Sequence, residues 1–135
     1  MARPYLGGTN GGVKTVSAAV TLSTADSSKK IFVSEGSANY DITLPAVSNI
    51  GCEFTFILTA SPSSYDIDVV SAAGDDIIGL EFADEDTAAA SDSDWDKITF
   101  STNAVAGSYA TFVSNGTNWF AHMFGNSDSA FSQTD

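Results

Sequence analysis

The sequence predicts an all-β fold, either an antiparallel β-sandwich or a β-barrel, on three observations. Apolar and polar residues alternate through much of the chain, which is the period of a strand that buries one of its faces. Clusters of Gly, Pro, Asn, Asp and Ser interrupt the alternating stretches and predict turns between short strands. A strong hairpin signal lies near the C-terminus, and no stretch has the spacing of an amphipathic helix.

The hairpin signal is Asn115-Gly116, because both positions tolerate the positive φ angles of a two-residue antiparallel turn. Phe112 precedes the turn, and Trp119 and Phe120 follow it. Closing the turn brings the bulkiest apolar side chains of the C-terminal third into one cluster. We therefore expect paired strands at 109–114 and 119–124.

Other alternating stretches predict strands at 18–22, 30–34, 40–44, 52–58, 65–69 and 97–101, with a very short strand at 77–78. The stretch 52–58 has the clearest pattern, with Cys52, Phe54 and Phe56 on one face. Asp66 and Asp68 are expected to point to solvent, because a shift of one residue would bury both carboxylates. Residues 82–95 are the least regular part, with room for one helical turn at most.

Composition and charge limit the partners of this chain. The net charge is −12, from 17 acidic and 5 basic residues. Such a surface repels phosphate groups, which argues against nucleic acid and anionic membranes as partners. The hydrophobic fraction is 43%, but much of it is Ala, so the 135 residues are expected to form one domain with a thin core. Association with further copies of the chain is therefore expected.

The acidic segment before Lys97 is the best candidate for a metal site in the sequence. Asp92, Asp94 and Asp96 resemble the start of a calcium loop, but Lys97 stands where such a loop needs Gly, and Asn103 where it needs Glu. The alternative is a solvated acidic loop. No metal and no other cofactor is predicted.

The single His and the single Cys offer little catalytic chemistry. His122 shares a strand face with Phe120 and Phe124, and it is either hydrogen-bonded at a sheet end or meets its own copies on a threefold axis, where three imidazoles can bind a metal. Cys52 forms no intrachain disulfide and is expected to be a small core residue rather than a nucleophile. Without a phosphate-binding loop or placed pairs of catalytic carboxylates, the chain is not predicted to be an enzyme.

The predicted domain organisation is a flexible arm at 1–12, a β domain at 13–125 and a loose, polar C-terminal tail at 126–135. Glycines fill much of the arm, and no apolar stretch is long enough for a signal peptide, so synthesis in a host cytoplasm is expected. The tip of the arm is suited to docking on another surface, the alternative being a frayed end without a role. Its four anchoring residues are Arg3, Pro4, Tyr5 and Leu6.

The order of several short motifs resembles a β module of tailed-phage structural proteins. The motifs are Tyr40-Asp41-Ile42-Thr43-Leu44-Pro45, Gly51-Cys52-Glu53-Phe54-Thr55-Phe56, Asp66-Ile67-Asp68-Val69, Gly74-Asp75-Asp76-Ile77-Ile78-Gly79 and the hairpin from Phe112 to Phe120. The resemblance covers about residues 40–124, apart from 82–108. The acidic insertion at 83–96 departs from the spacing of the module and receives no role from it.

The resemblance implies a tail-fibre-like β domain that forms a homotrimer in a virion. Trp119, Phe120 and His122 are the residues expected at the trimer interface. A fibre needs a shaft and an assembly domain, so the arm and the size favour a capsid decoration (cement) protein on the outer capsid surface. Such a trimer would bridge and stabilise subunits of the major capsid protein. Because three arms belong to one trimer, binding of one arm raises the effective concentration of the other two at the capsid surface.

Two other functions are also compatible with the sequence. The first alternative is a tail fibre, spike or receptor-binding tip, whose loops would bind host surface glycan. A small lyase or glycosidase acting on capsule sugars is the second.

Overall fold

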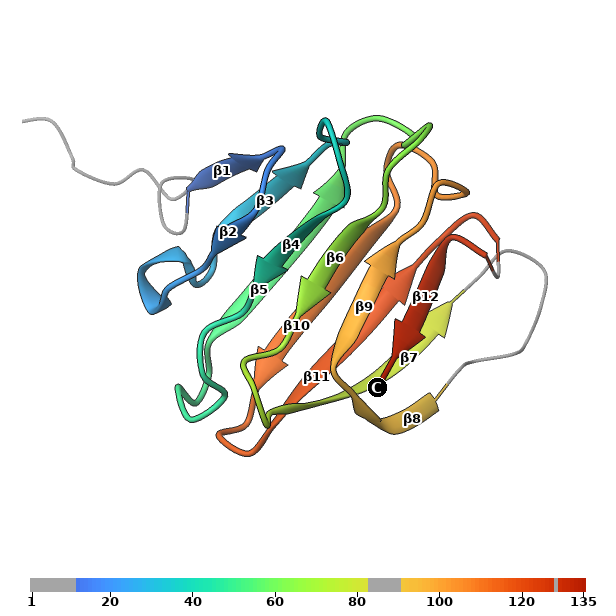
Figure 1. Ribbon diagram of the computed structural model, residues 1–135. Helices are drawn as coiled ribbons and strands as arrows, with labels where there is room; N and C mark the ends of the chain where they lie inside the picture. Colours follow the sequence, from blue (N-terminus) through green and yellow to red (C-terminus); the bar gives the residue numbers. More distant parts are fainter. Residues whose placement is uncertain (1–11, 83–90, 128) are drawn as a thin grey trace, which may run out of the picture.

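The computed structural model describes residues 12–82, 91–127 and 129–135. Within these residues the chain forms twelve β-strands and one short 3₁₀ turn, Thr24–Asp26 (Figure 1). The strands are β1 (Val13–Val16), β2 (Val20–Thr21), β3 (Lys30–Val33), β4 (Tyr40–Thr43), β5 (Glu53–Leu58), β6 (Ile67–Val70), β7 (Asp76–Phe82), β8 (Ser91–Trp95), β9 (Lys97–Phe100), β10 (Tyr109–Ser114), β11 (Asn118–Phe124) and β12 (Phe131–Thr134). No helix of the described residues is long and apolar enough to cross a membrane.

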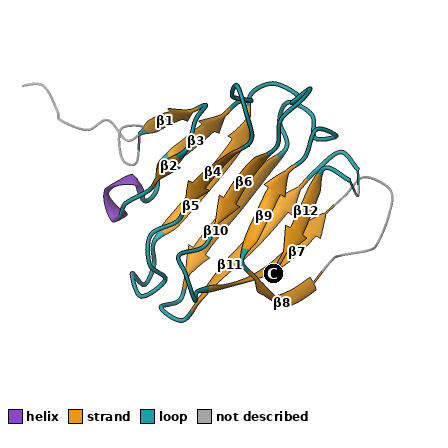
Figure 2. Ribbon diagram, viewed as in Figure 1, coloured by secondary structure: helices purple, strands orange, loops and turns teal. Residues whose placement is uncertain are grey.

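The strands form two stacked sheets, with loops and turns at their ends (Figure 2). The seven-stranded sheet has the order β1-β3-β5-β10-β11-β7-β8, and the five-stranded sheet the order β12-β9-β6-β4-β2. The prediction of an all-β fold is confirmed, and of the two predicted architectures the arrangement is sandwich-like.

In the first half of the chain, successive strands alternate between the two sheets. Strands β1, β3 and β5 pair in parallel in one sheet, while β2, β4 and β6 pair in parallel in the other. Parallel neighbours need a crossover connection, and here each crossover contains a strand of the opposite sheet. The β10–β11 hairpin then lies between β5 and β7, antiparallel to β5, while β11 and β7 are parallel.

The prediction of purely antiparallel sheets is therefore wrong, because both sheets are mixed. A half-buried strand shows the same alternation of residues in a parallel and in an antiparallel pair. Strand direction depends here on connections that cross from sheet to sheet, and those connections have no local sequence pattern.

The core between the sheets is closed by a single chain. Trp119 is fully buried, and it packs on Phe54 with ring centroids 5.9 Å apart. Phe56 meets Phe112 edge to face at 5.5 Å. The expectation of a thin core in one chain is thus wrong, because the few large side chains converge from both sheets. Cys52 is buried, as predicted.

Three local predictions also need correction. The expected loose tail at 126–135 is wrong for β12, which pairs with β9 and places the buried ring of Phe131 4.8 Å from that of Phe100. The expected very short strand near 77–78 is in fact the seven-residue strand β7. Asp68 points outward as predicted, but neighbouring side chains leave it only 9% exposed.

Candidate interaction face on the seven-stranded sheet

The outer face of the seven-stranded sheet carries a continuous row of apolar side chains. Strand register aligns one outward residue from each of five adjacent strands. In order from β7 to β3 they are Phe82, Phe124, Tyr109, Ile57 and Phe32. Neighbouring strands lie about 4.8 Å apart, so side chains of adjacent strands in this row are close enough to interact.

Three of these side chains form an aromatic ladder, Tyr109, Phe124 and Phe82. The rings of Tyr109 and Phe124 are stacked with centroids 4.6 Å apart and an interplanar angle of 14°. Phe124 stacks in turn on Phe82 at 4.8 Å and 10°. Phe82 is 46% exposed, although a phenylalanine of a soluble protein is usually buried.

Two more rows extend the apolar surface along the same strands. The next row has Leu80, His122 and Thr111, and the row beyond it has Ile78, Phe120 and Val113. Val113 is 41% exposed, and His122 is exposed beside half-buried Leu80 and Thr111. We call the outward side chains of β10, β11 and β7 in these three rows the ladder face; they are Tyr109, Thr111, Val113, Phe120, His122, Phe124, Ile78, Leu80 and Phe82.

The ladder face contains no carboxylate and no lysine or arginine among these nine described residues, although the chain has a net charge of −12. Charge appears at its border, where Asp76 lies on the outward side of β7 in the row next to Ile78. Glu53 on β5 accepts a hydrogen bond from Ser28 Oγ at 3.1 Å, and Lys30 on β3 donates one to Thr55 Oγ1 at 3.4 Å. A contiguous apolar patch of this kind marks an interaction site on a soluble protein.

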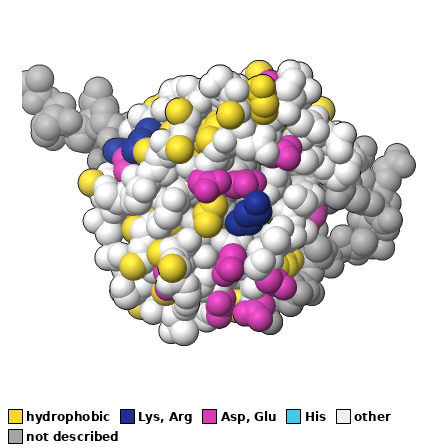
Figure 3. Space-filling view, in the orientation of Figure 1, with side chains coloured by type: hydrophobic (Ala, Val, Ile, Leu, Met, Phe, Trp, Pro, Cys, Tyr) yellow, Lys and Arg dark blue, Asp and Glu magenta, His cyan; other side chains and the backbone are white. Residues whose placement is uncertain are grey.

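The outer face of the five-stranded sheet is polar by contrast. Lys97 Nζ lies 2.9 Å from Asp68 Oδ2, and Thr99 Oγ1 donates to Asp68 Oδ1 at 2.5 Å. The hydrogen bond to Asp68 raises the pKa of Lys97, and the charges of Asp41 and Asp66 add to this effect. Figure 3 shows this side of the molecule, where acidic side chains surround a basic one.

The structure separates the residues predicted for the trimer interface. Phe120 and His122 lie on the ladder face, as their shared parity indicates. Trp119 points the other way and is completely buried inside its own chain, so its assignment to an intermolecular contact is wrong. The proposed anchors Arg3, Pro4, Tyr5 and Leu6 lie outside the described residues, as do Asp84 and the rest of 83–90.

Sequence reasoning missed the aromatic ladder. Tyr109, Phe124 and Phe82 are distant in sequence and come together only through the pairing of β10, β11 and β7. The available signal was the parity of Phe120, His122 and Phe124 on one strand face, which placed two aromatic rings opposite Trp119.

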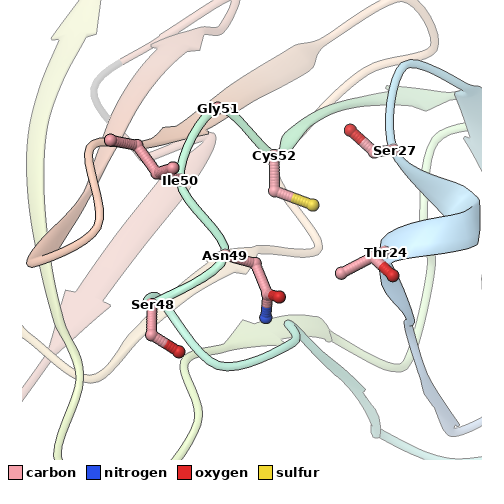
Figure 4. A pocket seen from close by; sticks show the side chains of 7 residues that line it. All are labelled: Thr24, Ser27, Ser48, Asn49, Ile50, Gly51 and Cys52. Carbon is pink, nitrogen blue, oxygen red and sulfur yellow. The ribbon is translucent and has the colours of Figure 1, made fainter.

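A shallow pocket of about 440 Å³ lies at one end of the sandwich (Figure 4). Its walls combine small polar side chains such as Thr24, Ser27 and Asn49 with the sulfur-bearing side of Cys52. No group of three or more His, Cys, Asp or Glu side chains in the described ranges is placed to hold a metal ion. The pocket offers hydrogen-bonding groups but no charged group, so the ladder face is the stronger candidate site.

Comparisons with protein-family models, with curated proteins and with solved structures find no match to this chain. The two unlike faces of the sandwich and the order of the motifs in the sequence are the features that indicate a function.

Proposed function

We propose that this protein is a capsid decoration (cement) protein of a tailed bacteriophage, a homotrimer that bridges and stabilises major capsid subunits on the outer shell of the virion. The observation that carries the proposal is the contrast between an apolar outer face on one sheet and an acidic outer face on the other. A chain with this contrast is built to be covered on one side and to face water on the other.

The residues of β3 and β5 support a covered outer face. Both strands carry fully buried apolar residues on the inner face of the seven-stranded sheet. A strand that is covered on both faces has apolar residues on its outer side as well. Phe32 and Ile57 on the outer face of β3 and β5 fit that pattern, since both are only half-buried by their own chain.

The resemblance to phage structural modules supplies the virion context. Its motifs fall on β4 and β6 of the five-stranded sheet and on β5, the start of β7 and the β10–β11 hairpin of the seven-stranded sheet, so they include the three strands that carry the ladder face. In this proposal the acidic outer face keeps decorated particles apart, and the arm at 1–12 docks on neighbouring capsid subunits.

The test counts the protein on particles that contain it and measures its mass in solution. Sedimentation equilibrium should give three times 14.0 kDa, and quantitative mass spectrometry of purified virions should give hundreds of copies per particle. Deleting residues 1–12 should abolish binding to capsids while leaving a folded trimer. A few dozen copies per virion, together with binding to host glycan, would instead identify a receptor-binding tail protein.

A further inference from the structure

We propose that copies of this chain pack against one another through the ladder face, with Tyr109, Phe124 and Phe82 at the centre of the contact. The inference rests on the proposed homotrimer and names the surface that forms it. In a closed trimer the three ladder faces turn toward a common axis, and each one contacts both of its neighbours.

The stacking geometry indicates a protein surface as the occupant of the ladder face. Sugars and nucleic acid bases bind an aromatic side chain through the exposed face of its ring. Here Tyr109 and Phe82 stack on the two faces of the Phe124 ring, with interplanar angles of 14° and 10°. The middle of the ladder therefore offers ring edges with aliphatic side chains around them, a surface that complements the apolar side chains of another protein.

The distribution of charge favours a second copy of the same chain. Two copies with a net charge of −12 repel each other wherever their carboxylates approach. The described residues of the ladder face contribute no carboxylate, so this surface allows close approach without burying like charges. Like-charged copies can therefore approach one another closely here, whereas contacts through the five-stranded sheet would bring Asp41 and Asp66 of different copies together.

We expect the interface to extend toward β3, because a stable contact needs a large buried area. An interface of ordinary size buries roughly 800 Å² on each partner. The ladder face has to be continued by Ile57 and Phe32, which complete the first row across β5 and β3. Lys30 and Glu53 then lie at the rim of the contact, where opposite charges can pair between copies.

The experiment compares lysine substitutions on the two outer faces of the full-length protein. Val113→Lys and Phe120→Lys each place an ammonium group on the ladder face, and Val113→Lys alters a side chain that is already 41% exposed. Thr43→Lys is the matched control, because it makes the same charge change on β4, on the outer face of the five-stranded sheet. Sedimentation equilibrium gives the mass of each protein, and near-ultraviolet circular dichroism reports whether it is folded.

The expected result is an oligomeric wild type and control, with both ladder-face variants folded. Phe120→Lys should weaken self-association at least ~100-fold, because an ammonium group would be buried in the contact, and Val113→Lys should weaken it less, because Glu53 lies opposite position 113 and can pair with the new charge. Ladder-face variants that keep the wild-type mass would overturn this inference and leave the proposed trimer intact. A control that dissociates as they do would overturn it too, since charge alone would then explain the effect. A wild type that stays at 14.0 kDa at high concentration would contradict both the trimer and its contact surface.

Discussion

Asp26 connects the edge strand β1 to the turn that precedes β3. Its carboxylate lies 3.1 Å from Lys14 Nζ on β1 and 2.8 Å from Lys29 Nζ, and the backbone N–H of Ser23 donates to it at 3.1 Å. Burial by itself would raise the pKa of Asp26, but the hydrogen bonds from Lys29, Ser23 and Lys14 outweigh it and hold this pKa well below its usual value. The charged form of Asp26 therefore stabilises the fold.

We expect Asp26→Asn to lower the free energy of unfolding at pH 7 by about 1–3 kcal/mol, because two lysines lose their charged acceptor. A lowered folded-state pKa contributes stability above the unfolded value of about 3.9 and loses it as the pH falls toward the folded value. The difference in free energy of unfolding between wild type and variant should thus reach its full value above about pH 5 and become smaller below pH 4. Urea unfolding across this pH range measures it, with exposed Asp135→Asn as the control. A difference that does not change with pH would mean that the charge of Asp26 is not responsible.

Gly79 provides room for a buried indole on the neighbouring strand. Gly79 lies at a position of β7 that faces the core. A Cβ atom at this position would lie 2.3 Å from the Trp95 ring. Trp95 is itself only 5% exposed, so its ring has little space to move. The pairing of β7 with β8 is irregular between Ile77 and Gly79, which is where the ring is accommodated.

We expect Gly79→Ala to destabilise the protein by about 1–3 kcal/mol through overpacking. The same substitution in a Trp95→Leu background should cost much less, because the clashing ring is gone. Thermal unfolding of the four proteins in this double-mutant cycle gives the coupling. Equal costs in both backgrounds would show that the ring of Trp95 does not limit this position.

The side of the strand to which each residue points was predictable from the sequence. How deeply each side chain is buried was less predictable. The alternation along β11 correctly placed Trp119 opposite Phe120 and His122. It did not show that Trp119 is covered by Phe54 of a different strand, and so by its own chain. Asp68 is buried for a similar reason, because Lys97 and Thr99 come from β9 across the sheet.

At the level of elements, the β3–β4 and β5–β6 connections are held together by one carboxylate. Glu35 accepts hydrogen bonds from the backbone N–H groups of Ser63, Ser64 and Tyr65 and from the Ser63 hydroxyl, at 2.5–3.1 Å. Solvation changes at this site act to raise the pKa of Glu35, but the hydrogen bonds, first that of Tyr65, lower it overall. Three successive N–H groups around one carboxylate form an anion-binding turn.

We expect Glu35→Gln to free the 63–65 turn, because the amide side chain brings N–H donors where acceptors are needed. Hydrogen exchange at residues 63–65 should become faster while exchange in β5 and β6 stays unchanged. Glu53→Gln makes the same charge change elsewhere and should leave the turn protected. Unchanged exchange in Glu35→Gln would show that the turn is ordered without its anion.

The existence of most strands was predictable, whereas their directions were not. Strands such as β4 and β5 follow from local alternation. Asn115-Gly116 correctly predicts the existence of the β10–β11 hairpin, but not its turn: Asn115 N–H donates to Asn118 O, so Gly116 and Thr117 are the central residues, and only Gly116 of the predicted pair has positive φ. The parallel pairing of strands in the first half of the chain depends on which sheet each strand joins. That is determined by packing between segments that are distant in the sequence. β12 escaped prediction because a single buried ring, Phe131, anchors it in an otherwise polar stretch.

At the scale of the whole molecule, the composition does not predict that the two outer faces differ in polarity. Many acidic residues are concentrated in 75–96, but the sequence does not show which outer face the others reach, because that depends on the sheet that each strand joins. Asp41 and Asp68 are neighbours in the five-stranded sheet, while Val113 and Phe120 are neighbours in the other. Tertiary pairing thus determines which outer face is apolar and which is acidic.

Salt should strengthen self-association of this protein if apolar surfaces form the contact. Each copy has a net charge of −12, so long-range repulsion opposes association at low ionic strength. Raising the NaCl concentration from about 20 mM to about 500 mM shortens the Debye length from roughly 20 Å to roughly 4 Å and screens that repulsion, while contacts between apolar side chains persist. We expect the dissociation constant, measured by sedimentation, to fall about tenfold or more over this range. Circular dichroism at each salt concentration controls for changes in folding. Weaker association at high salt would point instead to ion pairs, such as Lys30 with Glu53 of another copy, as the main source of affinity.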